Sequence, residues 1–212
     1  AAMAEKDSVI IDVRNAYESA IGSFQPPEGG AELIDPKMRN SIEFPKWLND
    51  AATQEKLKGK KVLMYCTGGI RCEKASAYLK HKGFPNVHQL EGGIIEYTRQ
   101  AKEKGLRNKF IGKNFVFDER LSERISDDVI AHCHTCNAPC DDHLNCANPT
   151  CNVLMIQCDA CRSKWQDTCG NECLDFVNLP EERQKELRKG TKAKGGFKRS
   201  QSAEGASPKR PK

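Results

Sequence analysis

The sequence predicts an α/β fold with a parallel sheet flanked by helices, followed by a small Cys-rich metal-stabilised module and a disordered basic tail. Three observations lead to this prediction. Short apolar runs alternate with helical segments over residues 8–104. Nine of the eleven cysteines fall between Cys133 and Cys173. Residues 183–212 hold 11 Lys and Arg against 2 Asp and Glu.

The elements of the first domain follow from local patterns. Apolar runs predict buried strands over residues 8–13, 61–65 and 86–90. Helices are expected over residues 15–20, 45–52, 72–82 and 94–104. Residues 22–35 are rich in Gly and Pro, so we expect a loop there. Active sites of parallel sheets lie at the carboxyl ends of the strands, and Cys66 is the first residue after the second strand.

Composition and hydropathy exclude a membrane-spanning protein. The chain has 212 residues, of which 38% are hydrophobic and 30% charged, and its mean hydropathy is −0.68. No apolar run approaches the roughly 18 residues that a membrane span needs, and the N-terminus carries no secretory signal. We therefore expect a cytoplasmic protein. Residues 1–4 are expected to be a remnant of cloning, and the chain to be a fragment of a longer protein.

The charge of the chain is unevenly distributed. Residues 183–212 have a net charge of +9, whereas the other residues hold 23 basic and 27 acidic side chains, a net charge of −4. From Gly190 onward the composition is of low complexity, so no fold is expected there. The simplest interpretation is a solvated, disordered tail. The functional alternative is contact with a polyanion, above all RNA.

A reactive cysteine is indicated by residues 65–72, Tyr-Cys-Thr-Gly-Gly-Ile-Arg-Cys. Cys66 enters a turn that becomes a helix N-terminus, whose open N–H groups and dipole stabilise an anion. Two glycines let successive N–H groups point inward, and an arginine adds a permanent positive charge. The pattern predicts a lowered pKa for Cys66 and an anion-binding loop made of Thr67, Gly68, Gly69, Ile70 and Arg71.

Both cysteines of this stretch also have a plain structural interpretation. A free cysteine at a strand end is commonly a small buried apolar residue, and this is the alternative for Cys66. Cys72 falls in the first turn of the predicted helix. There it is either a resolving thiol or a packing residue.

This pattern resembles a rhodanese domain. Four residues separate Cys66 from Arg71 after a strand, Asp12-Val-Arg14 precedes them and Leu90-Glu-Gly-Gly93 follows. In that family the loop cysteine carries a persulfide and passes its sulfur to a thiophile. Tyrosine phosphatases use a loop one residue longer to hold the larger phosphate, so the spacing here favours sulfur. We interpret Asp12 and Arg14 as a structural, salt-linked pair near the loop; direct catalytic groups are the less favoured alternative.

A longer match resembles the bacterial tRNA uridine hydroxylase family. It includes residues 64–77, 91–97 and 115–120 together with the cysteine array, and covers roughly residues 8–188. Members install 5-hydroxyuridine at the wobble position of tRNA in an oxygen-dependent reaction. They also carry a ferredoxin-like domain before the rhodanese domain, and we expect this chain to be a fragment that lacks it. The resemblance implies that Cys66 is the catalytic cysteine, persulfidated or oxidised during the cycle. It also implies molecular oxygen as co-substrate and the anticodon loop of tRNA as partner.

The domain boundaries follow from a change in composition. We expect a catalytic domain over residues 5–108 and a linker over 109–131 whose strand-like stretch at 110–120 packs on that domain. A Cys-rich module is expected over 132–177, then a short helix and the basic tail over 178–212. The module has few large apolar residues, so it cannot build an adequate core. In a reducing compartment it needs metal.

Two structural zinc sites are predicted, because four thiolates close a tetrahedral site. The first takes Cys133, Cys136, Cys158 and Cys161. The second, in a cross-brace order, takes Cys146, Cys151, Cys169 and Cys173. Cys140 is then spare, and His132, His134 and His143 are alternative ligands. An iron–sulfur cluster is the less favoured alternative, since thiolates also bind iron and a hydroxylation needs electrons; disulfides are the alternative without metal.

Three functions remain open at this point. The first is hydroxylation of the wobble uridine, with the Cys-rich module and the basic tail holding phosphate. The second is a plain sulfurtransferase that moves sulfane sulfur from a donor protein or small molecule to a thiophile through Cys66. The third is a non-catalytic, zinc-stabilised RNA-binding protein. Cys66 and Arg71 weigh against the third, and the family resemblance favours the first.

Overall fold

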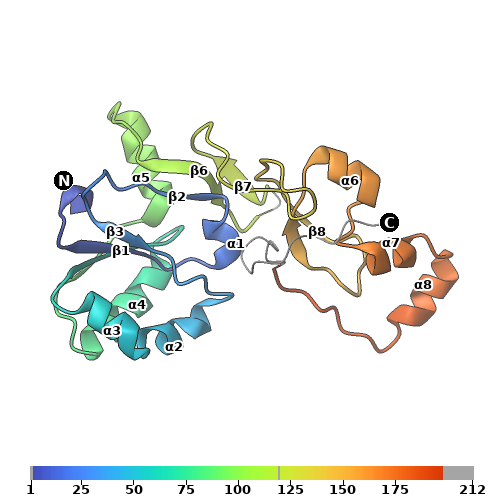
Figure 1. Cartoon of the computed structure of the whole chain (residues 1–212), viewed down its shortest axis with the longest axis horizontal. Coiled ribbons are helices and arrows are strands. Elements are labelled where there is room, and N and C mark those ends of the chain that lie inside the picture. Colours follow the sequence, from blue (N-terminus) through green and yellow to red (C-terminus); the bar gives the residue numbers. More distant parts are fainter. Residues whose placement is uncertain (1, 119, 198–212) are drawn as a thin grey trace. The chain divides into compact units, whose positions relative to one another are not determined.

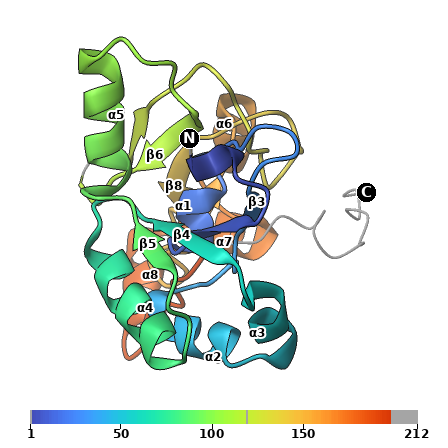
Figure 2. The ribbon, with the colours of Figure 1, turned by 90° about the vertical axis from the view of Figure 1, so that its left-hand side faces the viewer.

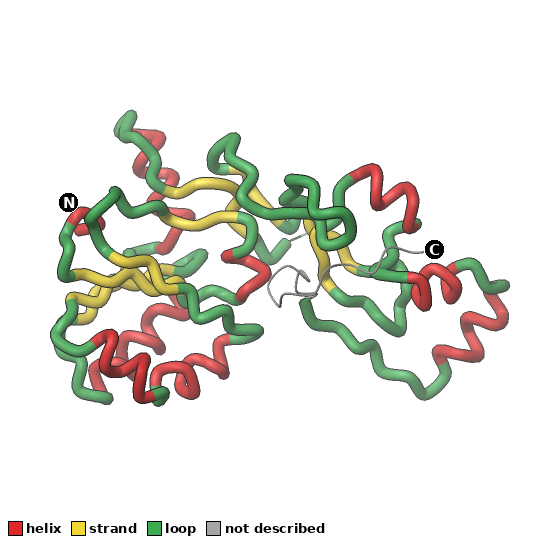
Figure 3. Tube along the Cα trace, viewed as in Figure 1, coloured by secondary structure: helices red, strands yellow, loops and turns green. Residues whose placement is uncertain are grey.

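The chain divides into two compact units, residues 1–128 and residues 129–212 (Figure 1). The structure is a computed structural model and describes residues 2–118 and 120–197. Figure 3 shows that both units combine helices, strands and long loops. In the described residues, no helix has the length and apolar character that a membrane crossing requires.

Unit 1 is built on a four-stranded parallel sheet, as predicted. Its strands are β1 (Ser8–Asp12), β3 (Glu32–Ile34), β4 (Lys61–Tyr65) and β5 (Val87–Gln89), in the order β3-β1-β4-β5. Ile11 in β1 lies opposite Met64 in β4 and Ile34 in β3. The strands predicted over residues 8–13, 61–65 and 86–90 are confirmed. Because β1 and β4 are central, their carboxyl ends at Asp12 and Tyr65 lie side by side.

The helices of unit 1 are α1 (Ala16–Ser19), α2 (Phe44–Leu48), α3 (Ala51–Leu57), α4 (Ile70–His81) and α5 (Gly93–Glu103). The helix predicted over residues 45–52 is in fact divided between α2 and α3. Asp50 is the reason, because its extended backbone ends the first helix and its carboxylate accepts the Thr53 N–H at 3.0 Å, which caps the next. A 3-10 helix (Ser41–Glu43) precedes α2.

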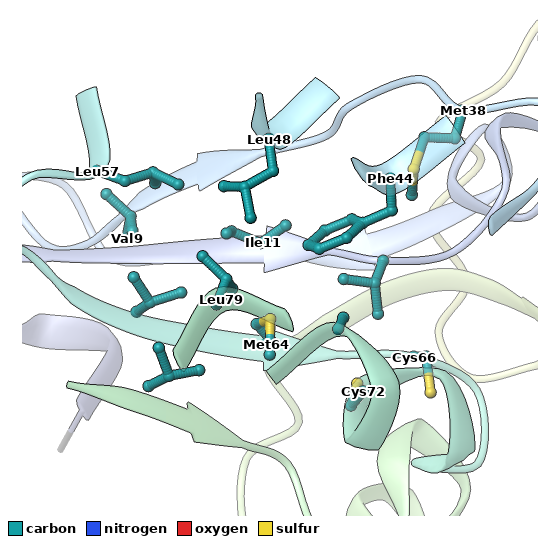
Figure 4. Packing of buried hydrophobic residues seen from close by; sticks show 14 residues of the cluster. Val9, Ile11, Met38, Phe44, Leu48, Leu57, Met64, Cys66, Cys72 and Leu79 are labelled. Atoms are coloured by element: carbon teal, nitrogen blue, oxygen red, sulfur yellow. The ribbon is translucent and has the colours of Figure 1, made fainter. Parts of the chain in front are cut away.

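Each face of the parallel sheet carries its own apolar core. Val9, Ile11 and Met64 point to the face that α2, α3 and α4 cover (Figures 2 and 4). Ile10 and Tyr65 point to the other face, where they meet Phe24, Ile94 and Phe110. The alternation of neighbours between faces is the two-residue period of a strand. Burial on both faces explains why the strands are continuous apolar runs.

The loop predicted over residues 22–35 is wrong at two places. β2 (Gly22–Phe24) pairs antiparallel with β6 (Phe110–Phe115), and β3 pairs with β1. Both are three-residue strands, which are too short to show a period in the sequence. The β2–β6 contact also requires Gly22, since a Cβ there would lie 2.1 Å from the Lys113 carbonyl oxygen.

Most of the segment assigned to a linker lies within unit 1. β6 pairs with β2 on one side and with β7 (Ser122–Arg124) on the other, and unit 1 extends to Asp128. Residues 2–4, assigned to a cloning remnant, form a 3-10 helix (Ala2–Ala4). The Met3 carbonyl of that helix accepts the Ala31 N–H at 3.0 Å.

Unit 2 is small and has few buried apolar side chains. It contains the hairpin of β8 (His143–Asn145) and β9 (Leu154–Ile156), and the helices α6 (Asp159–Trp165), α7 (Asn171–Val177) and α8 (Glu181–Arg188). Within the basic segment predicted to be disordered, Gly195 donates to the Cys151 carbonyl at 2.8 Å and Gly196 accepts from Leu154 at 2.8 Å. The rest of that segment, residues 198–212, lies outside the described residues.

Candidate active site and metal centres

The candidate active site forms where β4 ends and α4 begins. Cys66 directly follows β4, and its side chain and that of Cys72 in the first turn of α4 lie in the same core (Figure 4). Cys66 is 1% exposed. Gly69 stands at the N-cap of α4 with a φ of +92°, and its N–H donates to the Cys66 Sγ at 3.0 Å. The loop therefore turns back over the sulfur.

The start of α5 holds the backbone of this loop through hydrogen bonds and a close contact at a glycine. The N–H groups of Ile94 and Ile95 donate to the carbonyls of Cys66 and Thr67, at 3.0 and 3.1 Å. Gly93 has a φ of +64°, and a Cβ there would lie 2.5 Å from each of these two carbonyl oxygens. The second glycine of the Glu-Gly-Gly motif thus packs directly against the loop backbone, and this position has no room for a side chain.

Cys66 has the ionisation of a reactive thiol. Its pKa is lowered to about 5, above all by a hydrogen bond from the Cys72 thiol, and further by N–H groups of Cys72 and Gly69 and by the Arg71 charge. These contacts outweigh burial, which acts in the opposite direction. The same hydrogen bond and burial raise the pKa of Cys72 far above its ordinary value. The pair therefore carries one thiolate, on Cys66, and one proton, on Cys72.

Arg71 is positioned by Glu18, a residue that the sequence analysis did not single out. The two guanidinium nitrogens of Arg71 contact the two Glu18 carboxylate oxygens at 2.5 and 2.8 Å, and the Thr67 hydroxyl donates to the same carboxylate at 2.9 Å. The spacing Asn15-x-x-Glu18, typical of a capping box, is the sequence signal that could have pointed to Glu18. Glu18 Oε2 accepts the Asn15 N–H at 3.0 Å, as in a capping box.

Asp12 and Arg14 form the salt-linked structural pair that was predicted. Arg14 is fully buried, and its Nη2 lies 2.7 Å from Asp12 Oδ2. The Tyr65 hydroxyl donates to the same oxygen at 2.7 Å. Arg14 also donates to the Glu18 carbonyl at 3.4 Å. This network ties β1 to the end of β4 and to α1, so it fixes the place from which the cysteine loop starts.

The anion-binding capacity of the loop rests on its backbone. Within the part of the chain that the structure describes, the N–H groups of Gly68, Ile70 and Arg71 have no protein acceptor. The charge of the Arg71 side chain is already balanced by Glu18. An additional anionic atom on the Cys66 sulfur would thus depend on these open N–H groups at the start of α4.

The cysteines of unit 2 gather into two sets of four. Sulfur atoms that all lie within 4.8 Å of one another define each set: Cys133, Cys136, Cys158 and Cys161 in one, and Cys146, Cys151, Cys169 and Cys173 in the other. These are the same two sets that the spacing indicated, in the same interleaved order along the chain.

The geometry of both sets fits a tetrahedral zinc ion. Sulfurs bonded to one zinc at about 2.3 Å stand about 3.8 Å apart, and the Cys136–Cys158 and Cys151–Cys169 pairs are 3.6 Å apart. Backbone and amide N–H groups also point at the sulfurs, from Thr135 to Cys133 and from Asn148 to Cys173, both at 3.4 Å. Such donors are the usual second layer around metal-bound thiolates.

Cys140 belongs to neither set, and none of the three candidate histidines belongs to either. Cys140 is buried. The Nδ1 of His134 accepts the Ile156 N–H at 3.3 Å, so this ring contributes to the hairpin.

Comparisons with known proteins match the chain in two parts, and the second match begins within unit 1 and continues into unit 2. Residues 1–100 match the Rhodanese-like domain family, and residues 111–174 match the family described as Rhodanase C-terminal. A tRNA uridine(34) hydroxylase of Pectobacterium carotovorum is 52% identical over 186 residues, covering 88% of this chain and 50% of that protein. One of Cronobacter sakazakii is 50% identical over 187 residues, covering 88% of this chain and 51% of that protein. The chain thus spans about half the length of these curated relatives.

A solved structure from Rhodopseudomonas palustris, described as a possible tyrosine phosphatase, is 23% identical with a TM-score of 0.34. It covers 48% of this chain and 70% of that chain, and the score is too low to indicate a shared fold.

The parallel sheet and the cysteine loop at its carboxyl edge define a rhodanese-domain protein. Beyond that domain, 88% of the chain is similar to proteins named tRNA uridine(34) hydroxylase, at 50–52% sequence identity.

Proposed function

We propose that this chain carries the catalytic domain of an enzyme that hydroxylates the wobble uridine of tRNA to 5-hydroxyuridine, with Cys66 as the catalytic residue. The observation that carries the proposal is the buried Cys66 thiolate, which has a pKa of about 5 and lies beneath the start of α4. A protein that only bound RNA would have no use for such a thiolate. The relatives that are 51–52% identical to this chain over 88% of its length are named for this reaction.

The residues of the loop have distinct roles in this proposal. Cys66 reacts as a thiolate or carries a persulfide, for which the open N–H groups of Gly68, Ile70 and Arg71 form the anion site. Thr67 and Gly69 shape the loop, and Cys72 holds the proton that keeps Cys66 ionised. In this proposal, one atom of molecular oxygen is added to the uracil. The other atom leaves as water, with two protons and with two electrons from an external reductant of the thiol class. The partner is the unpaired anticodon loop, whose bases are accessible.

Unit 2 is proposed to be a structural module that holds two zinc ions. Each site has four thiolates and no open position, which is typical of structural rather than catalytic zinc. The ions would provide the stability that the small apolar core of this unit does not. Cysteines that bind metal and form no disulfides are typical of a reducing cytoplasm, and we propose that compartment for the enzyme.

A sulfurtransferase is the second candidate, because the Cys66-x4-Arg71 spacing and the match to the Rhodanese-like domain family over residues 1–100 favour it. In that reaction the same loop would hold a persulfide, taken from a small donor or a donor protein, and pass the outer sulfur to a thiophile.

Mass spectrometry of tRNA nucleosides separates these functions. Cells that lack the full-length gene are complemented with the wild type, with Cys66→Ser, or with Cys140→Ser as a matched control at another buried cysteine. We expect the wild type and Cys140→Ser to restore 5-hydroxyuridine and Cys66→Ser to restore none. Restoration by a folded Cys66→Ser protein would refute the role of Cys66. If no version restores the nucleoside while the wild type transfers sulfur from thiosulfate to cyanide, the sulfurtransferase is the better assignment.

A further inference from the structure

Exposed apolar side chains gather around the cysteine loop. Among the residues that the structure describes, seven large apolar side chains are strongly exposed, and three of them adjoin this loop. Ile70 is 73% exposed and belongs to the loop itself. Ile95 is 50% exposed, and its N–H donates to the Thr67 carbonyl. Phe117 is 65% exposed, and the guanidinium carbon of Arg71 lies over its ring, 5.6 Å from the centroid.

Phe117 is held in this exposed position by its surroundings. The turn that carries it is closed by a hydrogen bond from Val116 to the Leu121 carbonyl at 3.2 Å. An ion pair between Asp118 and Arg120 at 2.7 Å braces the same turn. The edge of the Phe117 ring meets the buried ring of Phe115, with centroids 5.3 Å apart and planes at 71°. Arg71 lies near one face of the ring, and the residue as a whole is 65% exposed, so the ring keeps surface that a ligand can cover.

An aromatic ring that stays exposed beside an anion site leaves apolar surface in contact with water, which is unfavourable unless a ligand covers it. Single exposed apolar residues are common on protein surfaces, but a group of them around a reactive loop is typical of a ligand site. The two preceding residues, Phe115 and Val116, are buried, so the exposure begins at Phe117. A stacked nucleobase would cover the exposed part of the Phe117 ring, and the Arg71 guanidinium would reinforce the stack.

We propose that Phe117 is a substrate-positioning residue that stacks on an unpaired pyrimidine base of RNA, with Ile70 and Ile95 as the apolar rim around that base. The inference deepens the proposed function and rests on it. A pyrimidine suits the site because it has a flat apolar face for Phe117. The stack would hold the base beside Cys66, and no covalent step is assigned to Phe117.

The test compares two RNAs and four versions of the chain. The RNAs are an anticodon stem-loop with uridine at the wobble position and the same stem-loop with an abasic site there. The versions are the wild type, Phe117→Ala, Phe117→Trp and Leu106→Ala. Leu106 is a matched control, because it is an apolar residue in unit 1 with a similar exposure of 61%. Binding is measured by fluorescence polarisation of the labelled RNA, and circular dichroism checks that each version is folded.

We expect Phe117→Ala to bind the uridine stem-loop about 10-fold more weakly than the wild type, which corresponds to about 1.4 kcal/mol. Its affinity for the abasic stem-loop should not change, and Leu106→Ala should bind both RNAs like the wild type. Phe117→Trp should keep the affinity, and its added tryptophan fluorescence should be quenched by the uridine stem-loop, with the wild type as background for Trp47 and Trp165.

Three results would overturn the inference. Wild-type affinity of Phe117→Ala for the uridine stem-loop would exclude a stack. An equal loss of affinity for both RNAs would assign Phe117 to the backbone or to the fold. In both cases the hydroxylase proposal would stand, because the wild type binds RNA. Failure of the wild type to bind either RNA would overturn the inference and the proposed function together.

Discussion

At the scale of single residues, the site holds a negative charge on Cys66 and a proton on Cys72 in a buried position. Burial alone would raise the pKa of Cys66, so the thiolate exists because its neighbours donate hydrogen bonds to it. Cys72 is the strongest of these donors. The permanent positive charge of Arg71 is held near the sulfur by the buried Glu18 carboxylate. Each of these contacts can be tested by a single substitution.

The titration of Cys66 is the first prediction. Because its pKa is lowered to about 5, the thiolate should dominate above about pH 5. Its modification by methyl methanethiosulfonate should therefore reach a plateau above about pH 6 and fall to half of the plateau rate near pH 5. An ordinary thiol, with a pKa near 8.5, would still gain reactivity above pH 8. Peptide-resolved mass spectrometry separates Cys66 from the cysteines of unit 2.

Two variants of Cys72 test the cause of that shift. Cys72→Ala removes the donor that contributes most, so the midpoint for Cys66 should move upward, toward the ordinary thiol value. Cys72→Ser keeps an O–H donor of similar size, so its midpoint should stay close to that of the wild type. Equal midpoints for Cys72→Ala and the wild type would mean that N–H groups and Arg71 suffice.

Glu18→Gln is the second prediction. The Glu18 carboxylate is fully buried and is shared by Arg71, Thr67 and the Asn15 N–H. Removal of its charge leaves Arg71 without its counter-charge, and we expect the free energy of unfolding of unit 1 to fall by about 2 kcal/mol. Urea titration followed by amide exchange in β1 and β4 measures it.

The control for Glu18 is Glu103→Gln, which breaks another Arg–Glu pair. Arg99 and Glu103 are both more than half exposed, so solvent screens their attraction and no measurable loss is expected. If both variants lost the same stability, the buried position of Glu18 would have no special role.

At the scale of elements, the site is a strand, a turn and two helix starts that fit closely. The loop between β4 and α4 depends on α5, because the first backbone N–H groups of α5 bind its carbonyls. Gly92 and Gly93 both have a positive φ. The start of α5 therefore fixes the backbone from which the loop leads to α4, while the N–H groups that contact the sulfur come from the start of α4.

Gly93→Ala is the third prediction. The new Cβ would meet the Cys66 and Thr67 carbonyl oxygens at 2.5 Å, so the loop or α5 must move. Gly105→Ala is the matched control. Gly105 has a similar φ of +59° but no atom within 4 Å of a new Cβ, and it should cost only the backbone strain of about 1 kcal/mol.

The difference between these two variants isolates the close contact. We expect Gly93→Ala to lower the unfolding free energy by clearly more than Gly105→Ala and to raise the Cys66 pKa, because the Gly69 N–H is displaced with the loop. Thermal unfolding and the Cys66 titration measure both effects. Similar behaviour of the two variants would show that the loop adapts without loss.

The elements also show what could be predicted from the sequence. Cys66 and its loop were predicted because strand, glycines and arginine are contiguous, and the parallel sheet because its strands are apolar on both faces. Glu18 was missed because its contact with Arg71 joins residues 53 apart in the sequence. β2 was missed because its partner β6 lies far along the chain. α6 and α7 were missed because cysteines, and not an apolar period, define their inner faces.

At the scale of the whole molecule, the two units have different sources of stability. Unit 1 buries two apolar cores on the faces of a parallel sheet. Unit 2 has a two-stranded sheet and short helices. Its buried side chains include four of the eight clustered cysteines, namely Cys133, Cys146, Cys161 and Cys173, and also Cys140, which belongs to neither cluster. We expect a unit of this kind to depend on bound metal for its fold. The consequence is that metal removal should affect one unit and spare the other.

Metal content is the final prediction. The purified wild type should contain two zinc ions per chain by elemental analysis, and no iron–sulfur absorbance. Cys133→Ser and Cys146→Ser should each lower the content to one, because each removes a ligand from a different set. Cys140→Ser, outside both sets, should retain two. A chelator should abolish amide protection in β8 and β9 and leave β1 and β4 protected, because the cores of unit 1 need no metal. Loss of protection in both units would show that they unfold together, and a metal-free protein with full protection in β8 and β9 would refute the structural zinc sites.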